Sequence, residues 1–218
     1  IVDAVFRDYL PTWLQQYPDL YVNLDGELQE EIEFRDATIR LMALAMMIIY
    51  ALMAVAFRSY WQPMLILTAV PFGLMGAIFG HMILGWQVSL FSIMGVTACA
   101  GVVVNDNLVL IDRINRLRGE GQEVVSALLQ AGEDRFRPII LTSLTTFVGL
   151  LPIMSETSVQ AQFLIPMVTS LSFGVLFATG VTLILVPALY LIAEDLSAFK
   201  SRLLDRYQRH QGETPSPS

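Results

Sequence analysis

Three consecutive polar residues, Asn105, Asp106 and Asn107, interrupt an apolar stretch that runs from residue 88 to 111. Ionisable side chains inside a membrane-crossing helix are costly, and they usually face a bundle interior or a water path that carries protons or ions. Asn105 lies eight residues before Arg113, about 12 Å of helix rise, so the triplet falls inside the span and not at its edge. Proton transfer is therefore the chemistry to expect, with Asp106 as the candidate carrier.

The helical period puts Asn105 and Asp106 on different faces, about 100° apart. The residues that share the face of Asn105 are Ala98, Gly101 and Asp112. One of the two faces is expected to look into the bundle. Under an alternative interpretation, Asn105 and Asn107 only join neighbouring helices through hydrogen bonds, and Asp112 is an interfacial residue beside Arg113.

A stripe of hydroxyl groups lies on one side of the apolar stretch 138–154. Its members, together with one glycine, are Thr142, Thr145, Thr146 and Gly149. Hydroxyls can orient a proton through water, and they can equally bond their own backbone carbonyls or pack helices together. Arg135, which precedes this stretch, either anchors the positive side of the membrane or reaches up to the region of Asp106.

Small residues at helical spacing predict close approach between helices. The glycines expected to do this are Gly76, Gly80, Gly101, Gly149 and Gly174. We predict no metal site, because His81 stands alone as an interfacial side chain and Cys99 lies in an apolar run. The chain has no catalytic triad, phosphate-binding loop or paired-histidine motif, so neither an enzyme nor a cofactor is expected. Its net charge of −7 also disfavours nucleic-acid binding.

These polar groups must be positioned by membrane helices, because 55% of the residues are hydrophobic and only 15% are charged. Five apolar stretches are long enough to cross a hydrocarbon core of about 30 Å, or most of it. They cover residues 41–57, 64–84, 88–111, 138–154 and 163–193. The predicted fold is an all-α polytopic membrane bundle of five transmembrane helices.

The distribution of basic residues predicts the orientation of the bundle. Ten of the 13 Lys and Arg residues follow the first, third or fifth stretch, which places all ten on one side of the membrane. The loops 81–87 and 155–162, on the other side, contain none. Because positive loops stay in the cytoplasm, we expect a periplasmic N-terminal segment and a cytoplasmic tail.

The segments outside the apolar spans are interpreted separately. Residues 1–36 are interpreted as the end of a periplasmic domain, an α/β remnant with a short strand and turn at 20–26. The transmembrane domain is predicted to cover residues 37–198, with an amphipathic segment at 113–134 along the cytoplasmic membrane face. Residues 199–218 are predicted to be a largely disordered cytoplasmic tail.

Several segments together resemble the resistance-nodulation-division family of inner-membrane efflux pumps. Residues 56–63 and 70–73 resemble the link between the eighth and ninth membrane helices of that family. Residues 101–111 resemble its tenth helix, and residues 135–144 resemble its eleventh. The three matches occur in the family's order along nearly the whole chain, to about Asp195.

The resemblance implies a twelve-helix protomer with two periplasmic porter insertions, of which this chain would hold helices eight to twelve and the end of the second porter domain. In the drug-export branch, the full-length proteins are homotrimers in the bacterial inner membrane. They exchange protons for amphiphilic compounds, often with a periplasmic adaptor and an outer-membrane channel. The chain is accordingly expected to be part of a secondary active transporter, an antiporter driven by the proton motive force.

The resemblance also implies a proton site formed by two aspartates on the fourth helix, a lysine on the tenth and a threonine on the eleventh. Asn105 matches that lysine and Thr142 matches that threonine, while Asp106 falls where the best-known members carry asparagine. Because this chain lacks the lysine, the salt bridge that the family's lysine forms with the aspartates cannot form here. We therefore expect a relay of Asn105, Asp106 and Thr142, supported by Arg135 from the cytoplasmic side. The alternatives are a related branch that transports metals, lipids or proteins, and a membrane scaffold or sensing domain without ion coupling.

Overall fold

Every element that the computed structural model describes, within residues 10–16 and 27–212, is an α-helix. The helices are α2 (Leu10–Gln16), α3 (Glu27–Phe57), α4 (Trp61–Leu67), α5 (Val70–Leu84), α6 (Leu90–Gly119), α7 (Val124–Met154) and α8 (Val159–Gly212). Five segments are long and apolar enough to cross a membrane, namely Ile32–Phe57, Trp61–Leu84, Leu90–Gly119, Val124–Met154 and Val159–Glu194. The predicted helical membrane class is therefore confirmed.

The chain divides into two compact units, Ile1–Thr38 and Ile39–Ser218. In the first unit the described elements are α2 and the opening turns of α3, and both are helical. The strand and turn predicted at residues 20–26 lie outside the described residues, so the α/β character of this segment stays a prediction. The second unit holds the helical bundle.

The second span is broken where the sequence predicted one helix over residues 64–84. α4 ends at Leu67, and α5 begins at Val70 with Pro71 in its first turn. Proline has no N–H to continue the helical ladder but is tolerated in a first turn, so the helix stops and restarts around it. The Thr68 hydroxyl donates a hydrogen bond of 2.6 Å to the carbonyl of Leu65 at the break.

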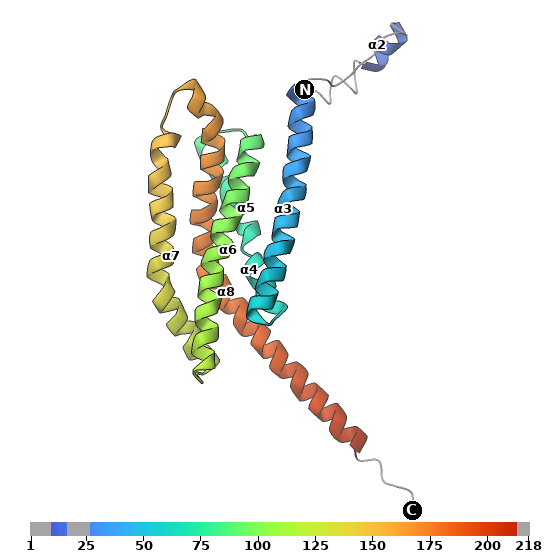
Figure 1. The fold of residues 1–218 in the computed structure, drawn as a ribbon, viewed down its shortest axis with the longest axis vertical. Coiled ribbons are helices and arrows are strands. Elements are labelled where there is room, and N and C mark those ends of the chain that lie inside the picture. The colour runs from blue at the N-terminus through green and yellow to red at the C-terminus, as the bar shows by residue number, and fades with distance from the viewer. Residues whose placement is uncertain (1–9, 17–26, 213–218) are drawn as a thin grey trace, which may run out of the picture. The chain divides into compact units, whose positions relative to one another are not determined.

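The predicted amphipathic segment 113–134 is divided between the end of α6 and the start of α7, and its place along the membrane face stays a prediction. α6 continues to Gly119, and α7 already begins at Val124, after a tight turn in which Gly121 has φ of 89°. Pro138, expected to open the fourth helix, lies inside α7. An interior proline removes one backbone hydrogen bond and bends a helix without having to end it, and the first turns of α7 lean toward the end of α6 (Figure 1).

The last helix is longer than predicted. α8 continues through Pro166 and Pro187 to Gly212, so residues 199–212 of the predicted disordered tail are helical. Residues 213–218 lie outside the described part of the chain.

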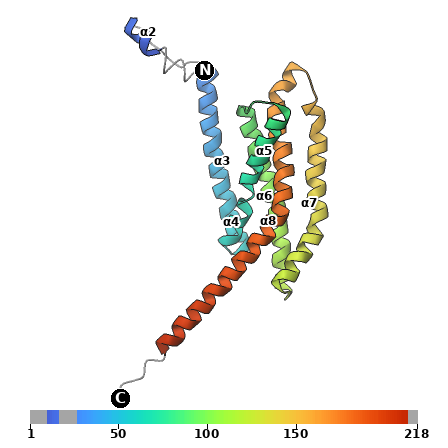
Figure 2. The ribbon, with the colours of Figure 1, turned by 180° about the vertical axis from the view of Figure 1, so that it is seen from behind.

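α8 is the centre of the bundle and packs against α5, α6 and α7. Seen from behind, it lies across α6 between α5 and α7 (Figure 2). One core cluster joins α6 to α8 at their cytoplasmic-predicted ends through residues such as Ile111, Ile114 and Val186. A second cluster, around Cys99 and Val175, lies nearer the other end.

Candidate functional site

Asp106 lies near the middle of α6 and is half-buried. Its carboxylate oxygen Oδ2 is fully buried and has no hydrogen-bond partner among the described residues. Buried polar atoms in native proteins almost always have a partner, so an unsatisfied carboxylate oxygen calls for an explanation such as a functional role or an unseen partner. This is the strongest functional signal in the described part of the chain.

The two neighbouring asparagines differ from Asp106 and from each other. Asn105 is exposed on the bundle. Asn107 is buried, and its Nδ2 donates a hydrogen bond of 2.9 Å to the carbonyl of Val103, one turn earlier in its own helix. The Nδ2 of Asn107 is therefore satisfied within α6, and Asn107 forms no hydrogen bond to another helix of the described residues. Asn105 is exposed to a partner from outside these five spans.

The direction of Asp106 follows from Arg113, seven residues later and so on nearly the same face of α6. The Nη2 atom of Arg113 lies 2.6 Å from Oδ2 of Asp134, and its Nε donates a bond of 2.8 Å to the same oxygen. Because Asp134 belongs to α7, this face of α6 is the one beside α7. Asp106 thus faces toward α7, and Asn105 turns about 100° away from it.

Arg135 lies on α7, immediately after Asp134. It is half-buried, and its Nε atom is buried without a hydrogen-bond partner among the described residues. Asp106 and Arg135 are therefore an acid and a base on neighbouring helices, and each has one unsatisfied polar atom. No hydrogen bond or ion pair joins them within the described chain.

The threonines of α7 are satisfied within their own helix. The Thr142 hydroxyl donates a bond of 2.8 Å to the carbonyl of Pro138, and Thr145 and Thr146 donate to carbonyls of the preceding turn. All three hydroxyls thus bond backbone in this structure, as the alternative interpretation of the stripe expected. Thr142 makes no bond to Asp106.

Sequence reasoning missed a polar contact between helices that is made by Ser143, the residue after Thr142. Ser143 and Thr179 form a buried hydrogen bond of 2.7 Å between α7 and α8, and the Ser143 hydroxyl lies 3.1 Å from the carbonyl of Ile139. Helical periodicity places Ser143 about 100° from Thr142, on a different face of α7, but only the structure shows that this face is packed.

His81 is buried, with 3% exposure, and is not the interfacial side chain that was predicted. Its Nδ1 donates to the carbonyl of Ala77 at 2.9 Å, and the Ser92 hydroxyl lies 2.8 Å from Nε2. The N–H of Ser89 donates to the Ser92 oxygen at 3.0 Å. His81 therefore ties α5 to the start of α6, which explains why an isolated histidine can be buried in an apolar helix.

A second missed network lies near the charged end of the bundle. The side-chain amides of Gln62 and Asn115 exchange two hydrogen bonds of 3.0 and 2.9 Å, and the Tyr190 hydroxyl donates to the Asn115 oxygen at 3.2 Å. Nearby, Arg118 and Glu194 form an ion pair of 2.8 Å. These contacts fix the start of α4, the last turns of α6 and an interior part of α8 relative to one another.

The five glycines fall into two groups. A Cβ atom at Gly76 or Gly80 would lie 2.6 Å from atoms of Phe173, and one at Gly174 would lie 2.7 Å from Sγ of Cys99. These three glycines are sites where α5, α6 and α8 touch closely. A Cβ at Gly101 or Gly149 would meet nothing within 4 Å, so neither packs closely against another helix of the described residues.

The described residues contain no group of three or more His, Cys, Asp or Glu side chains that could hold a metal ion. They do form a bundle of several membrane spans, and Asp106, near the middle of α6, has a buried carboxylate oxygen without a hydrogen-bond partner. This combination defines a polytopic membrane protein with an ionisable site inside its spans, a class to which ion-coupled transporters belong.

The chain belongs to the AcrB/AcrD/AcrF family, which matches residues 12–194. The resemblance to the resistance-nodulation-division superfamily is thereby confirmed, although its drug-export branch is not distinguished. The chain is 30% identical over 191 residues to the cobalt-zinc-cadmium resistance protein CzcA of Cupriavidus metallidurans, covering 84% of the chain and 18% of that protein. The cation efflux system protein CzcA of an Alcaligenes species matches to the same extent.

The fold is also similar to that of a solved heavy metal efflux pump. The TM-score is 0.69 at 23% identity, over 85% of this chain and 19% of the pump. The chain thus spans less than a fifth of the length of these relatives.

Proposed function

We propose that this chain is the C-terminal membrane part of a resistance-nodulation-division transporter that exports heavy-metal cations in exchange for protons. The names of the relatives, cobalt-zinc-cadmium resistance and cation efflux, support the metal substrate. Sequence reasoning put amphiphilic compounds first and metals among its alternatives. The relatives favour the metal alternative.

The proposal of proton coupling rests on the Oδ2 atom of Asp106, which is buried and has no hydrogen-bond partner among the described residues. A protonated carboxyl is neutral and tolerates such a site, whereas the ionised form needs a cation or hydrogen-bond donors. Arg135 has an unpartnered Nε on the neighbouring helix, and we assign it the role of meeting the ionised form. Loading and release of a proton at Asp106 would then change the interaction between α6 and α7.

The other members of the predicted relay take supporting roles. Asn105 cannot carry the charge of the lysine that it matches in the family, but its exposed amide can bond groups from the rest of the protein. The Thr142 hydroxyl, now on the carbonyl of Pro138, could rotate toward a carboxylate that has lost its proton. One proton moving down 100 mV yields about 2.3 kcal/mol, and a pH unit adds about 1.4 kcal/mol, enough to shift a balanced conformational equilibrium.

The metal cation itself would be bound outside the described residues of this chain. This assignment follows from the lack of a ligand cluster among the described residues. We further propose the family's assembly for the full-length protein, a homotrimer in the bacterial inner membrane with a periplasmic adaptor and an outer-membrane channel. The basic loops predict that the end of α8 is cytoplasmic and that the segment before the first span is periplasmic.

The test is Zn²⁺ flux by the full-length protein in proteoliposomes with an imposed proton gradient. We expect Asp106→Asn to reduce gradient-driven flux at least about tenfold, because the amide cannot exchange a proton. Asp112→Asn is the matched control, since Asp112 lies on the same helix, is partly exposed and pairs with Arg116 at 3.0 Å.

Two outcomes test different parts of the proposal, namely the role of Asp106 and the metal substrate. Undiminished flux in Asp106→Asn would remove Asp106 from the coupling. Gradient-driven export of a fluorescent amphiphile, with no Zn²⁺ flux, would contradict the metal substrate and leave the role of Asp106 intact.

A further inference from the structure

His81 is a buried titratable side chain that the coupling proposed at Asp106 does not use. It lies in the last turn of α5, and its residue is 3% exposed. Its Nδ1 lies 2.9 Å from the carbonyl of Ala77 in the same helix, and its Nε2 lies 2.8 Å from the Ser92 hydroxyl of α6. Because a carbonyl can only accept, neutral His81 carries its hydrogen on Nδ1, and Nε2 is the nitrogen that can take up a second proton.

Two hydroxyl groups connect Nε2 to the surface of the described bundle. The Ser92 oxygen lies 3.4 Å from Oγ of Ser89, the N-cap residue of α6, and either hydroxyl can be the donor. Ser92 is buried, with 2% exposure, whereas Ser89 is partly exposed and follows the exposed loop 85–88. A hydrogen-bonded route therefore runs from the end of the bundle to the buried ring.

This route can be satisfied with and without an extra proton. In the neutral state the Ser92 hydroxyl donates to Nε2. When a proton binds the Ser89 oxygen, the Ser89 hydrogen passes to Ser92 and the Ser92 hydrogen passes to Nε2, so each oxygen again holds one hydrogen. The new N–H at Nε2 donates to Ser92, whose hydroxyl turns toward Ser89. Both N–H groups of the charged ring then have an acceptor, which a buried charge requires.

No charged side chain competes for this site within the elements that pack around it. α5 packs against α6 and α8. Asp, Glu, Lys and Arg are absent from α5, from residues 85–104 and from residues 159–193. Glu156, in the loop between α7 and α8, already accepts the backbone N–H groups of the two residues that follow it.

Backbone partial charges act on the ring in place of side chains. The carbonyl end of a helix favours a cation, and His81 lies at that end of α5. The start of α6 carries the opposite partial charge, but its N–H groups at Ser89 and Ser92 are bonded to hydroxyl oxygens.

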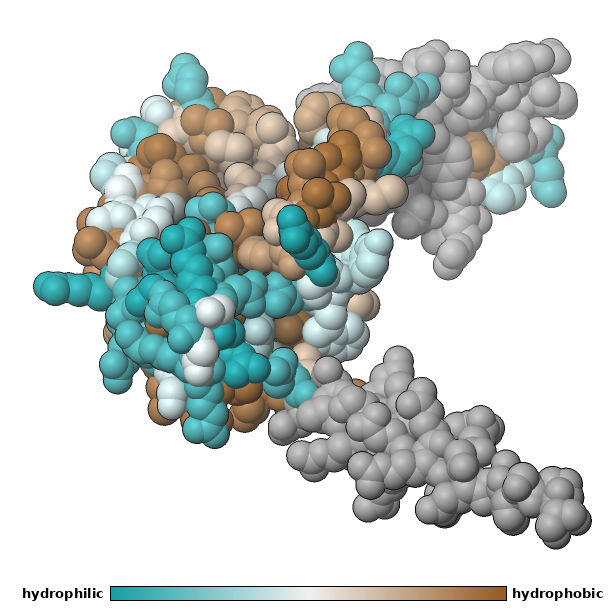
Figure 3. All heavy atoms as spheres, turned by 60° about the horizontal axis from the view of Figure 1, so that its bottom comes forward, coloured by the Kyte–Doolittle hydropathy of each residue, from teal (hydrophilic) through white to brown (hydrophobic). Residues whose placement is uncertain are grey.

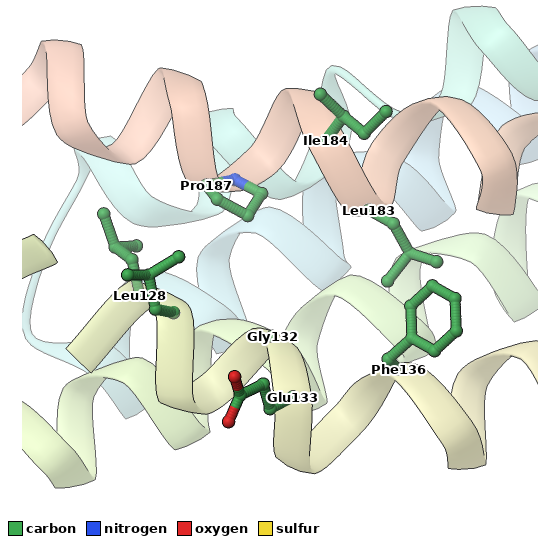
Figure 4. Close-up of a pocket in the computed structure, with 8 residues that line it drawn as sticks. Leu128, Gly132, Glu133, Phe136, Leu183, Ile184 and Pro187 are labelled. Atoms are coloured by element: carbon green, nitrogen blue, oxygen red, sulfur yellow. The ribbon is translucent and has the colours of Figure 1, made fainter. Parts of the chain in front are cut away.

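The ion pairs of the bundle lie at its opposite end. Arg113–Asp134 and Arg118–Glu194 join helices there, and the surface seen from that end is strongly hydrophilic (Figure 3). Glu133 also belongs to that end, where it lines a groove between α7 and α8 whose other lining residues are apolar (Figure 4). About 30 Å of helix rise separates Ser92 from Arg113 on α6, so these charges do not face His81.

We propose that His81 is a second proton-binding residue of this protein, loaded through Ser89 and Ser92 from the end of the bundle that the basic loops predict to be periplasmic. Histidine suits this task because its charge changes between pH 5 and 8. Proton binding at His81 stands by itself; its use in export rests on the proposed function.

The experiment is NMR spectroscopy of the full-length protein in lipid nanodiscs, labelled with ¹⁵N in histidine only, between pH 5 and 8. We expect the His81 ring to carry one hydrogen, on Nδ1, at pH 8 and two at pH 5. Ser92→Ala removes the acceptor for Nε2 and should lower the proton affinity of His81 about three- to tenfold, because bonds to a charged group are stronger than neutral ones. Ser155→Ala is the matched control, since the Ser155 hydroxyl bonds the carbonyl of Leu151 at the end of α7.

His81→Gln identifies the His81 signals by their loss, and their shift in Ser92→Ala identifies them independently. A ring that keeps a single hydrogen down to pH 5 would overturn the proposal. Equal proton affinities in Ser92→Ala and Ser155→Ala would overturn the route through Ser92. Normal Zn²⁺ flux in Asp106→Asn would remove the proposed role of Asp106 and leave the assignment of His81 standing.

Discussion

Gly76 provides a quantitative test of the packing between α5 and α8. A Cβ added there would lie 2.6 Å from the carbonyl oxygen of Phe173, 2.6 Å from Cβ of Phe177 and 3.0 Å from Cα of Gly174. Non-bonded carbon atoms are comfortable at about 3.5–4.0 Å, and two of these three contacts are with backbone, which cannot rotate away. Gly76→Ala therefore requires the two helices to separate by roughly 1 Å.

The expected magnitude is the balance of two effects. Overpacking a tight site costs about 1–3 kcal/mol, whereas replacing glycine by alanine inside a helix gains about 1 kcal/mol. Separation would also disturb the neighbouring contact of Phe79 with Phe177, whose ring centroids lie 5.4 Å apart. We expect the free energy of unfolding to fall by up to about 2 kcal/mol in Gly76→Ala.

The assay is SDS titration of the full-length protein in mixed micelles, followed by circular dichroism. Gly180→Ala is the matched control, because Gly180 lies on α8, is exposed and has nothing within 4 Å of a Cβ. This control should be neutral or more stable by up to about 1 kcal/mol. A Gly76→Ala protein as stable as Gly180→Ala would show that the close approach of α5 and α8 is not rigid, and the packing argument would fail.

Two further predictions concern buried hydrogen bonds. His81→Phe should lower the free energy of unfolding by about 1–3 kcal/mol, because it leaves the buried Ser92 hydroxyl without its partner. The same titration measures the change, and an unaltered midpoint would mean that the His81 bonds add nothing to stability. Ser143→Ala and Thr179→Val should each destabilise slightly, and their double-mutant cycle should give a coupling of about 0.6 kcal/mol, typical of hydrogen bonds between membrane helices. Strictly additive effects would contradict a direct bond between these hydroxyls.

The number and position of the spans could be predicted from the sequence alone. Hydrophobic length and the membrane thickness that it must match are local properties, so the stretches around 41–57, 88–111 and 163–193 each correspond to a helix of the structure. Counting the residues between Asp106 and Arg113 likewise predicts how far Asp106 lies inside the membrane span. The family resemblance also rested on short local motifs.

The ends of the helices were predicted less well, because they depend on competition between local signals and packing. Pro71 breaks a helix in the second span, yet Pro138 lies inside α7. Leu117, Ala127 and Leu128 pack in one core cluster, which joins the end of α6 to the start of α7.

The role of each polar or small side chain was decided only by the tertiary structure. Gly76 and Gly149 are the same residue type in similar helices, but one is covered by Phe173 and the other meets nothing. His81 is buried because Ser92, eleven residues away, supplies a hydrogen bond to its ring. Helical periodicity determines which residues share a face; only the placement of the other helices determines whether that face meets a neighbour, a lipid or the rest of the protein.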